Sequence, residues 1–229
     1  MSIGVAVLVV AKVPVPGFAK TRLAREIGNG AAADLAAASL LDTLDAVTST
    51  GVAHRVVALT GDLARATRSR EITAALKGVT VLEQRGGNFA ERLVNAHADT
   101  FTMTKSPVLQ IGMDTPQVTA HLLGDAAALL ADEAPTCVLG PAEDGGWWAL
   151  GVPDPGVAEA ILPVPTSSSE TGRKTYEALI AAGASVRLLP TLRDVDHAAD
   201  LGPVAAQCAL GSRFRTCEYL LTFRGLLRN

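Results

Sequence analysis

Apolar runs of strand character alternate with helix-forming segments along this chain of 229 residues. The first run, Val5 to Val10, is apolar at every position, as in a strand that is buried on both faces of a sheet. Strands that alternate with helices form parallel sheets covered on both faces, because each parallel neighbour requires a crossover connection. The sequence therefore predicts an α/β fold, a single three-layer α/β/α sandwich with a mostly parallel, mixed central sheet.

Turn residues and helix caps set the expected boundaries of the elements. Asn88 and Glu91 have the spacing of an N-cap and its capping partner. Ser167 and Glu170 repeat that spacing, and Thr115 precedes a proline, which is typical of a cap and first helical turn. The predicted strands are 3–11, 54–59, 80–84, 108–113, 137–140, 147–152 and 185–189. The predicted helices are 31–47, 63–76, 88–101, 115–131, 167–182 and 198–206.

Length and composition favour one domain over residues 1–229, with 211–229 as a C-terminal helical extension. The net charge of −3, with both signs interspersed, excludes a broad positive field, so nucleic acid and anionic membranes are not expected as partners. No apolar stretch is long enough for a membrane span, and the three cysteines lack metal-ligand spacing. We expect a cytoplasmic protein, as a monomer or a homodimer, that binds small molecules.

A basic loop at 11–23, AKVPVPGFAKTRL, follows the first strand directly. It carries Lys12, Lys20 and Arg22 to the carboxyl edge of the sheet, where open α/β folds bind ligands. Its two prolines restrict the backbone, and Gly17 allows the backbone to come close to a ligand. The loop therefore predicts a phosphate site, although a solvated basic loop is the alternative.

Two better-known phosphate motifs are excluded. A P-loop requires glycines where this chain has Pro14 and Ala19 ahead of Lys20. The run 28–33 has the letters of a dinucleotide fingerprint, but it does not follow a strand directly. We interpret that run as a loop that leads into a helix.

Asp114 ends the predicted strand 108–113 and precedes a helix. A carboxylate in that position suits a hard divalent cation that keeps some of its waters. Capping of the helix is the alternative role for Asp114, but Thr115 can serve as the cap instead. The sequence therefore favours a metal ligand.

Two further segments carry acidic residues. In the run GPAEDGGWW at 140–148, Glu143 and Asp144 supply acceptors and the paired glycines allow close approach, while the same run predicts a hairpin turn. Asp194 and Asp196 occupy alternate positions after the last strand, so in an extended chain they point to opposite sides. One of them is expected to reach the metal, with helix capping as the alternative for Asp196.

These four segments, in this order, resemble the nucleotide-diphospho-sugar transferase superfamily with its GT-A, Rossmann-like fold. More narrowly they resemble a bacterial family formerly classed as a domain of unknown function and now often labelled glycosyltransferase, which is related to molybdenum-cofactor guanylyltransferase and phospholactate guanylyltransferase. The resemblance covers residues 3 to about 202 and rests on A-K-x-P-x-P-G-x-x-K-T-R-L, G-x-D-x-P, G-P-A-x-D-G-G and D-V-D. Trp147-Trp148 stands where that family usually has tyrosines, a difference that bears on the acceptor pocket.

Together with the motifs, the resemblance implies a divalent-metal-dependent transferase that binds a nucleotide and a small acceptor. The basic loop favours nucleotidyl transfer from a nucleoside triphosphate to a phosphorylated or acidic acceptor; the alternatives are a glycosyltransferase with a nucleotide-diphosphate sugar donor and a nucleotide-binding regulatory protein without turnover. The implied catalytic residues are Lys20, Arg22 and Asp114. The implied substrate-binding residues are Ala11, Lys12, Gly17, Gln84, Glu143, Asp144, Gly145, Gly146 and Trp147. The implied ligands of Mg²⁺ or Mn²⁺ are Asp114, Asp194 and Asp196.

Overall fold

The structure, a computed structural model, describes residues 2–132, 136–223 and 225. In these residues seven strands form one sheet in the order β3-β2-β1-β4-β6-β5-β7, and β6 alone runs antiparallel to its neighbours. The predicted α/β fold with a mostly parallel, mixed sheet is confirmed. The strands are β1 (Ile3–Lys12), β2 (Val52–Thr60), β3 (Thr80–Glu83), β4 (Val108–Gly112), β5 (Thr136–Pro141), β6 (Trp147–Val152) and β7 (Ser185–Leu188).

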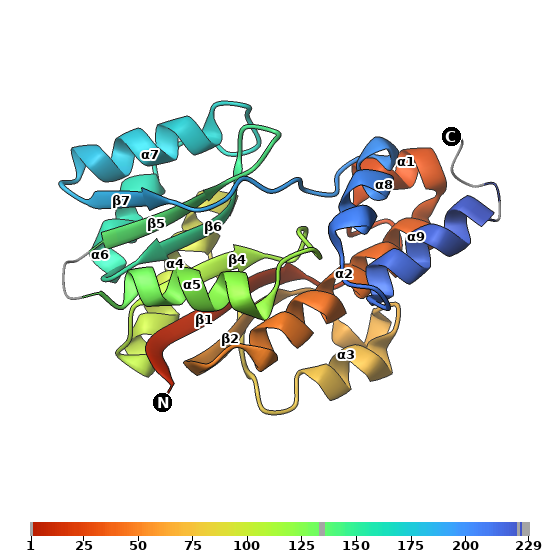
Figure 1. The fold of residues 1–229 in the computed structure, drawn as a ribbon, viewed down its shortest axis with the longest axis horizontal. Coiled ribbons are helices and arrows are strands. Elements are labelled where there is room, and N and C mark those ends of the chain that lie inside the picture. Colours follow the sequence, from red (N-terminus) through yellow and green to blue (C-terminus); the bar gives the residue numbers. More distant parts are fainter. Residues whose placement is uncertain (1, 133–135, 224, 226–229) are drawn as a thin grey trace.

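Helices cover both faces of the sheet (Figure 1). Alternate residues of β1 face opposite layers, since Val7 packs in the cluster with α2 (Asn29–Ser49) and α5 (Ala120–Leu130), and Leu8 packs in the cluster with α4 (Phe89–Thr104). The α4 layer also contains α6 (Pro155–Ala158) and α7 (Thr171–Ala181). Among the described residues, no helix has both the length and the apolar character needed to cross a membrane.

A separate helical cluster lies beside the sheet, on the right in Figure 1. It consists of α1 (Thr21–Ile27), α8 (Ala198–Gln207) and α9 (Arg213–Phe223), packed on α2. The Asp42 carboxylate of α2 accepts hydrogen bonds from the backbone N–H groups at the start of α9, which fixes that helix on the body. Positions 224 and 226–229 of the predicted C-terminal extension lie outside the described residues.

Several predicted helix boundaries were wrong. The chain forms α1 where no helix was expected. The run 28–33 does not follow a strand and leads into α2, as the sequence indicated, although that helix begins at Asn29 rather than at position 31. The helix predicted at 63–76 is divided into a 3₁₀ turn (Leu63–Arg65) and α3 (Ser69–Ala75). The division falls at Arg68, which has a left-handed φ of 56° and makes a bidentate ion pair with Asp34.

The predicted caps also need correction. Helix α5 begins at Ala120, and its cap is Thr119 rather than Thr115, because the Thr119 hydroxyl accepts from the Leu122 N–H. Ser167 does not cap α7 and instead has a left-handed φ of 58°. His197 is the N-cap residue of α8, so Asp196 is not its cap.

The order of the strands places a crevice at the carboxyl end of β1. Strands β2 and β3 lie on one side of β1, and β4 with the remaining strands lies on the other. The order in which strands are added to the sheet therefore reverses between the parallel neighbours β1 and β4, which is the position where open α/β sheets bind ligands. Lys12 ends β1 there, and Asp114 follows β4.

Helix α7 packs unusually closely on the turn between β5 and β6. The Gly172 N–H donates to the Gly145 carbonyl at 2.7 Å, and a Cβ on Gly172 would collide with the Gly146 carbonyl oxygen. Gly172→Ala is expected to lower the free energy of unfolding by about 1–3 kcal/mol, because backbone atoms cannot move aside easily. In α5, Gly124 has no atom near its own Cβ position, so Gly124→Ala should raise stability by up to about 1 kcal/mol. Urea denaturation of both variants tests this contact, and equal effects would contradict it.

Candidate functional site

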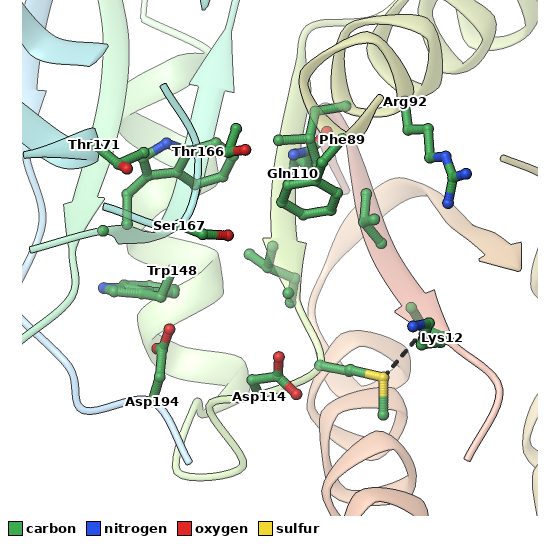
Figure 2. A pocket seen from close by; sticks show the side chains of 18 of the residues that line it. Lys12, Phe89, Arg92, Gln110, Asp114, Trp148, Thr166, Ser167, Thr171 and Asp194 are labelled. Atoms are coloured by element: carbon green, nitrogen blue, oxygen red, sulfur yellow. Dashed lines mark hydrogen bonds between the residues drawn. The ribbon is translucent and has the colours of Figure 1, made fainter. Parts of the chain in front are cut away.

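A cavity of about 480 Å³ lies at the carboxyl ends of β1 and β4. It is therefore at the point where the strand order changes direction. The backbone N–H of Lys12 donates to the Met113 sulfur at 3.3 Å and links the two strand ends (Figure 2). Most of the predicted site residues line this cavity: Ala11, Lys12, Lys20, Arg22, Gln84, Asp114, Asp144, Gly146, Trp147, Asp194 and Asp196.

The basic loop is held by its apolar residues. Val13 and Ala19 are buried, the Val13 N–H donates to the Thr60 carbonyl, and the Thr67 N–H donates to the Pro14 carbonyl. Lys20 ends the loop with a left-handed φ of 51° immediately before α1. The cations of the loop therefore project from a fixed backbone.

Lys20 is buried among carboxylates. Its ammonium lies 2.8 Å from Asp114 Oδ1 and 3.5 Å from Asp196 Oδ1, and it donates to the Val195 carbonyl. Burial by itself would lower the pKa of Lys20, but the attraction of Asp114 and Asp196 outweighs that effect and raises the pKa above its usual value. Lys20 is thus a permanent counter-ion inside the predicted metal site.

Asp194 lacks such a partner. Its Oδ1 atom is buried and has no hydrogen-bond partner among the described residues. Burial, followed by repulsion from Asp114, raises the pKa of Asp194 to about 7. The Asp114 carbonyl accepts from the Val195 N–H, and the Gln117 side chain donates to the Arg193 carbonyl, so this carboxylate is fixed next to the end of β4.

Asp196 is turned toward the basic loop. Its Oδ2 atom accepts from Arg22 Nη1 at 2.9 Å. Asp196 thus pairs with the cations of the basic loop, whereas Asp194 Oδ1 has no hydrogen-bond partner among the described residues. This difference agrees with the opposite orientations expected at alternate positions of an extended chain. The sequence analysis left open which of the two carboxylates would reach the metal.

The carboxylates fit a metal ion that is shared with a substrate. In residues 2–132, 136–223 and 225, no three His, Cys, Asp or Glu side chains are arranged to hold a metal ion by themselves. The Lys20 ammonium between Asp114 and Asp196 explains why these do not form such a group. The unpartnered Asp194 oxygen and the half-exposed Asp114 carboxylate suit Mg²⁺ or Mn²⁺, since Mg²⁺ is commonly held by one or two carboxylates together with substrate phosphates and water.

Three predicted site residues do not line the cavity. Gly17 borders a separate shallow hollow beside Phe18. The Glu143 carboxylate pairs with Arg193 at 2.5 Å, which ties the β5–β6 turn to the segment that carries Asp194. Gly145 lies in that turn against the Ser169 backbone. Glu143 and Gly145 therefore support the site from outside the cavity, whereas Gly17 belongs to a different hollow.

Gln84 lines the cavity but has a structural role as well. Its amide nitrogen donates to the carbonyls of Ala11 and Ala58, both at 2.8 Å. It therefore joins the ends of β1 and β2.

The sequence analysis missed part of the cavity lining. Phe89 and Arg92 enter from α4 and Gln110 from β4 (Figure 2). Figure 2 shows Thr166, Ser167 and Thr171 on the side opposite Arg92. Five residues with hydroxyl side chains from this region line the cavity: Thr166, Ser167, Ser168, Thr171 and Thr175. The polar run TSSS at 166–169 was the available signal, but it was interpreted only as a helix cap.

Removal of the Lys20 charge should destabilise the metal-free protein. Lys20→Met leaves Asp114 and Asp196 close together without their shared counter-ion, and we expect a loss of about 2 kcal/mol because Asp114 is partly exposed. Mn²⁺ should then raise the melting temperature of the variant more than that of the wild type, because the ammonium no longer competes. Thermal melts with EDTA or Mn²⁺ measure both effects. Lys77→Met, at an exposed position, is the control. If Mn²⁺ does not reduce the loss of stability in Lys20→Met, the ammonium and the metal do not compete for the carboxylates.

Asp194 should make the stability of the metal-free protein pH-dependent. Its pKa is raised from 3.8 to about 7, so the folded state favours the protonated form. Stability is complete below about pH 4 and falls as pH rises to 7, by up to about 1.4 kcal/mol per pH unit. Asp194→Asn should abolish this fall and exceed the wild type in stability at pH 8. Urea midpoints in EDTA at pH 5 and pH 8 test this, with the exposed Glu83→Gln as control; parallel pH profiles of the wild type and Asp194→Asn would refute it.

Comparison with known proteins supports the fold. The sequence pattern of the DUF2064 family, described as an uncharacterized protein conserved in bacteria, matches residues 43–168, more than half of the chain. No curated protein sequence matches the chain. Among solved structures, a candidate nucleotide-diphospho-sugar transferase from Desulfovibrio desulfuricans G20 has 26% identity and a TM-score of 0.82, with 100% of this chain and 98% of that chain covered.

Two more distant structures share the fold. A cytidylyltransferase from Leptospira borgpetersenii serovar Hardjo-bovis has 15% identity and a TM-score of 0.55 over 99% of this chain and 98% of that chain. Rv0371c from Mycobacterium tuberculosis H37Rv, solved as a complex with manganese, has 18% identity and a TM-score of 0.52 over 87% of this chain and 97% of that chain.

Proposed function

The chain belongs to the DUF2064 family of bacterial proteins, and we propose that it is a divalent-metal-dependent transferase that moves a nucleotidyl group from a nucleoside triphosphate to a small phosphorylated or acidic acceptor. The proposal rests on one observation: side chains of opposite charge cluster in the crevice between β1 and β4, where the strand order reverses. The unpartnered oxygen of Asp194 and the Asp114 carboxylate lie there, beside the cations Lys12, Lys20 and Arg22.

Asp114 and Asp194 are the residues that would hold Mg²⁺ or Mn²⁺. The metal would neutralise charge on the phosphates and on the leaving group. Asp196 is already paired with Arg22 and Lys20, so its role is to keep these cations at the edge of the site. This assignment makes Asp194, rather than Asp196, the direct ligand after the last strand.

Two cations remain for the phosphates. Lys12 is held 4.2 Å above the Phe18 ring, and Arg92 lies on α4; neither forms an ion pair within the described part of the chain. The acceptor oxygen would attack the α-phosphorus while the bond from that phosphorus to the bridging oxygen of the β-phosphate breaks. Pyrophosphate would then leave as an anion bound by Lys12 and Arg92.

Glycosyl transfer is the second candidate, and two observations favour it. The D. desulfuricans structure, at 26% identity, is a candidate nucleotide-diphospho-sugar transferase. In addition, Lys20 and Arg22 are bound to carboxylates, which leaves less positive charge for a triphosphate. In that reaction the bond between the sugar and the diphosphate breaks instead.

Direct competition between a nucleoside triphosphate and the matching diphosphate sugar, with Mn²⁺ present, separates the two reactions. Nucleotidyl transfer predicts about tenfold tighter binding of the triphosphate, equal to about 1.4 kcal/mol, and release of pyrophosphate with phosphorylated acceptors. Asp114→Asn should abolish metal-dependent nucleotide binding, whereas the exposed Asp125→Asn should not change it. A preference for the diphosphate sugar, with free sugar and no pyrophosphate as products, would establish glycosyl transfer instead.

A further inference from the structure

One wall of the cavity carries side chains to which nucleotidyl transfer gives no role. All nine lining residues between 147 and 175 are neutral: two tryptophans, two aliphatic residues and five with hydroxyl groups. We call the last five, Thr166, Ser167, Ser168, Thr171 and Thr175, the hydroxyl wall. Figure 2 shows Thr166, Ser167 and Thr171 across the cavity from Lys12 and Arg92. The cationic residues and these uncharged polar residues therefore lie on different sides of the cavity, and Asp114 and Asp194 lie along its lower edge in Figure 2.

Four buried polar atoms of the lining have no hydrogen-bond partner among the described residues; they belong to Gln110, Thr115, Thr175 and Asp194. Asp194 is part of the predicted metal site and Thr115 follows its other ligand, Asp114, which leaves Gln110 and Thr175. Thr175 is 0% exposed and Gln110 is 1% exposed, and both line the cavity. Neither Thr175 Oγ1 nor Gln110 Oε1 has a hydrogen-bond partner among the described residues. Buried polar side-chain atoms are nearly always satisfied in folded proteins. These two atoms therefore point to a ligand that supplies their hydrogen bonds.

The hydroxyl wall is held in place before any ligand binds. The Thr171 hydroxyl donates to the Pro165 carbonyl and accepts from the Ser168 N–H, which closes the loop onto the start of α7. A Cβ on Gly145 would collide with the Ser169 backbone, so the loop and the β5–β6 turn are in direct contact. A fixed wall loses little conformational freedom when a ligand binds.

We propose that the hydroxyl wall and Gln110 bind a neutral, polyhydroxylated group of the substrate, a hexose or an open-chain polyol, with Trp147 against its apolar side. A hydroxyl group both donates and accepts, so it can satisfy Thr175 Oγ1 and donate to Gln110 Oε1. A fully ionised phosphate only accepts, and this wall offers it no cation. The inference rests on the proposed function, which places the phosphates on the cationic side. The group can belong to a diphosphate-sugar donor or to the acceptor.

The chain offers a matched pair of variants. Thr175→Val removes a buried, unpartnered hydroxyl that lines the cavity and keeps the side-chain shape. Thr100→Val removes an equally buried, unpartnered hydroxyl on α4 that does not line the cavity. Any general effect on folding or packing should appear in both variants, and an effect on the ligand should appear only in the first.

Calorimetric titrations in Mn²⁺ would use UDP and UDP-glucose, GDP and GDP-mannose, ADP and ADP-glucose, and CDP and CDP-glucose. A second arm would titrate D-glucose, glucose 6-phosphate and sorbitol onto protein with Mn²⁺, with and without a nucleoside triphosphate. Thr175→Val should weaken the binding of at least one probe that carries a hexose or polyol by about five- to tenfold. It should leave the dissociation constants of the nucleoside diphosphates within about twofold of the wild-type values. Thr100→Val should change the affinity for neither group of probes.

If Thr175→Val weakens the binding of diphosphate sugars only, the hydroxyl wall is supported and the polyhydroxylated group belongs to the donor. If the variant weakens the binding of glucose, glucose 6-phosphate or sorbitol only, the hydroxyl wall is supported and the group belongs to the acceptor. Three outcomes would overturn the inference. Thr175→Val and Thr100→Val could have the same affinity for every probe, or Thr175→Val could lose as much affinity for a nucleoside diphosphate as for its diphosphate sugar. The third outcome is that the wild type binds no sugar or polyol. If no nucleotide binds but glucose binds in a Thr175-dependent way, the wall is supported and the proposed function fails.

Discussion

The ammonium group of Lys20 is the contact on which the rest of the site depends. It joins three parts of the chain that are far apart in sequence: the basic loop, the end of β4 at Asp114, and the segment around Val195 and Asp196. Because the ammonium is buried, loss of its carboxylate partners would leave an unpaired charge in the interior, which costs more than breaking a surface ion pair. It also neutralises part of the negative charge that Asp194 would otherwise meet, and so allows three carboxylates to gather at one edge of the sheet.

The chemistry of the cavity follows from which elements meet there. The first loop and α4 supply cations, the ends of β4 and the last extended segment supply carboxylates, and the region between β6 and α7 supplies indoles and hydroxyls. A phosphate and an uncharged polyhydroxylated group therefore find different surroundings within one cavity. That division suits a substrate with two chemically different ends.

Local patterns in the sequence were enough to predict the sheet but not the contacts between distant segments. The apolar run Val5 to Val10 correctly predicted the central strand. Every residue of that run is buried, because the strand is covered on both faces, and a local run of apolar residues records this directly. The break at Arg68 could not be predicted, since it accompanies an ion pair with Asp34 on another helix. Similarly, Thr115 and Thr119 are equally good cap residues, and only the path of the turn between them selects Thr119.

The candidate site shows the same limit. The family resemblance implied that Asp114, Asp194 and Asp196 would come together, but not that Lys20 would lie between two of them. The hydroxyl wall escaped notice because serine and threonine are also the usual residues of helix caps and turns. Burial without a partner, as at Thr175, is visible only in three dimensions.

The reversed direction of β6 has a consequence for how this cavity can change. Every other strand delivers its final residues to the ligand edge, whereas β6 delivers its first, through the short turn at 142–146. Strand hydrogen bonds hold both ends of that turn, since β5 and β6 pair from Val138 to Pro141. The turn is also in backbone contact with the start of α7, since the Gly172 N–H donates to the Gly145 carbonyl. A change in the turn would therefore move the hydroxyl wall while the strands keep their register.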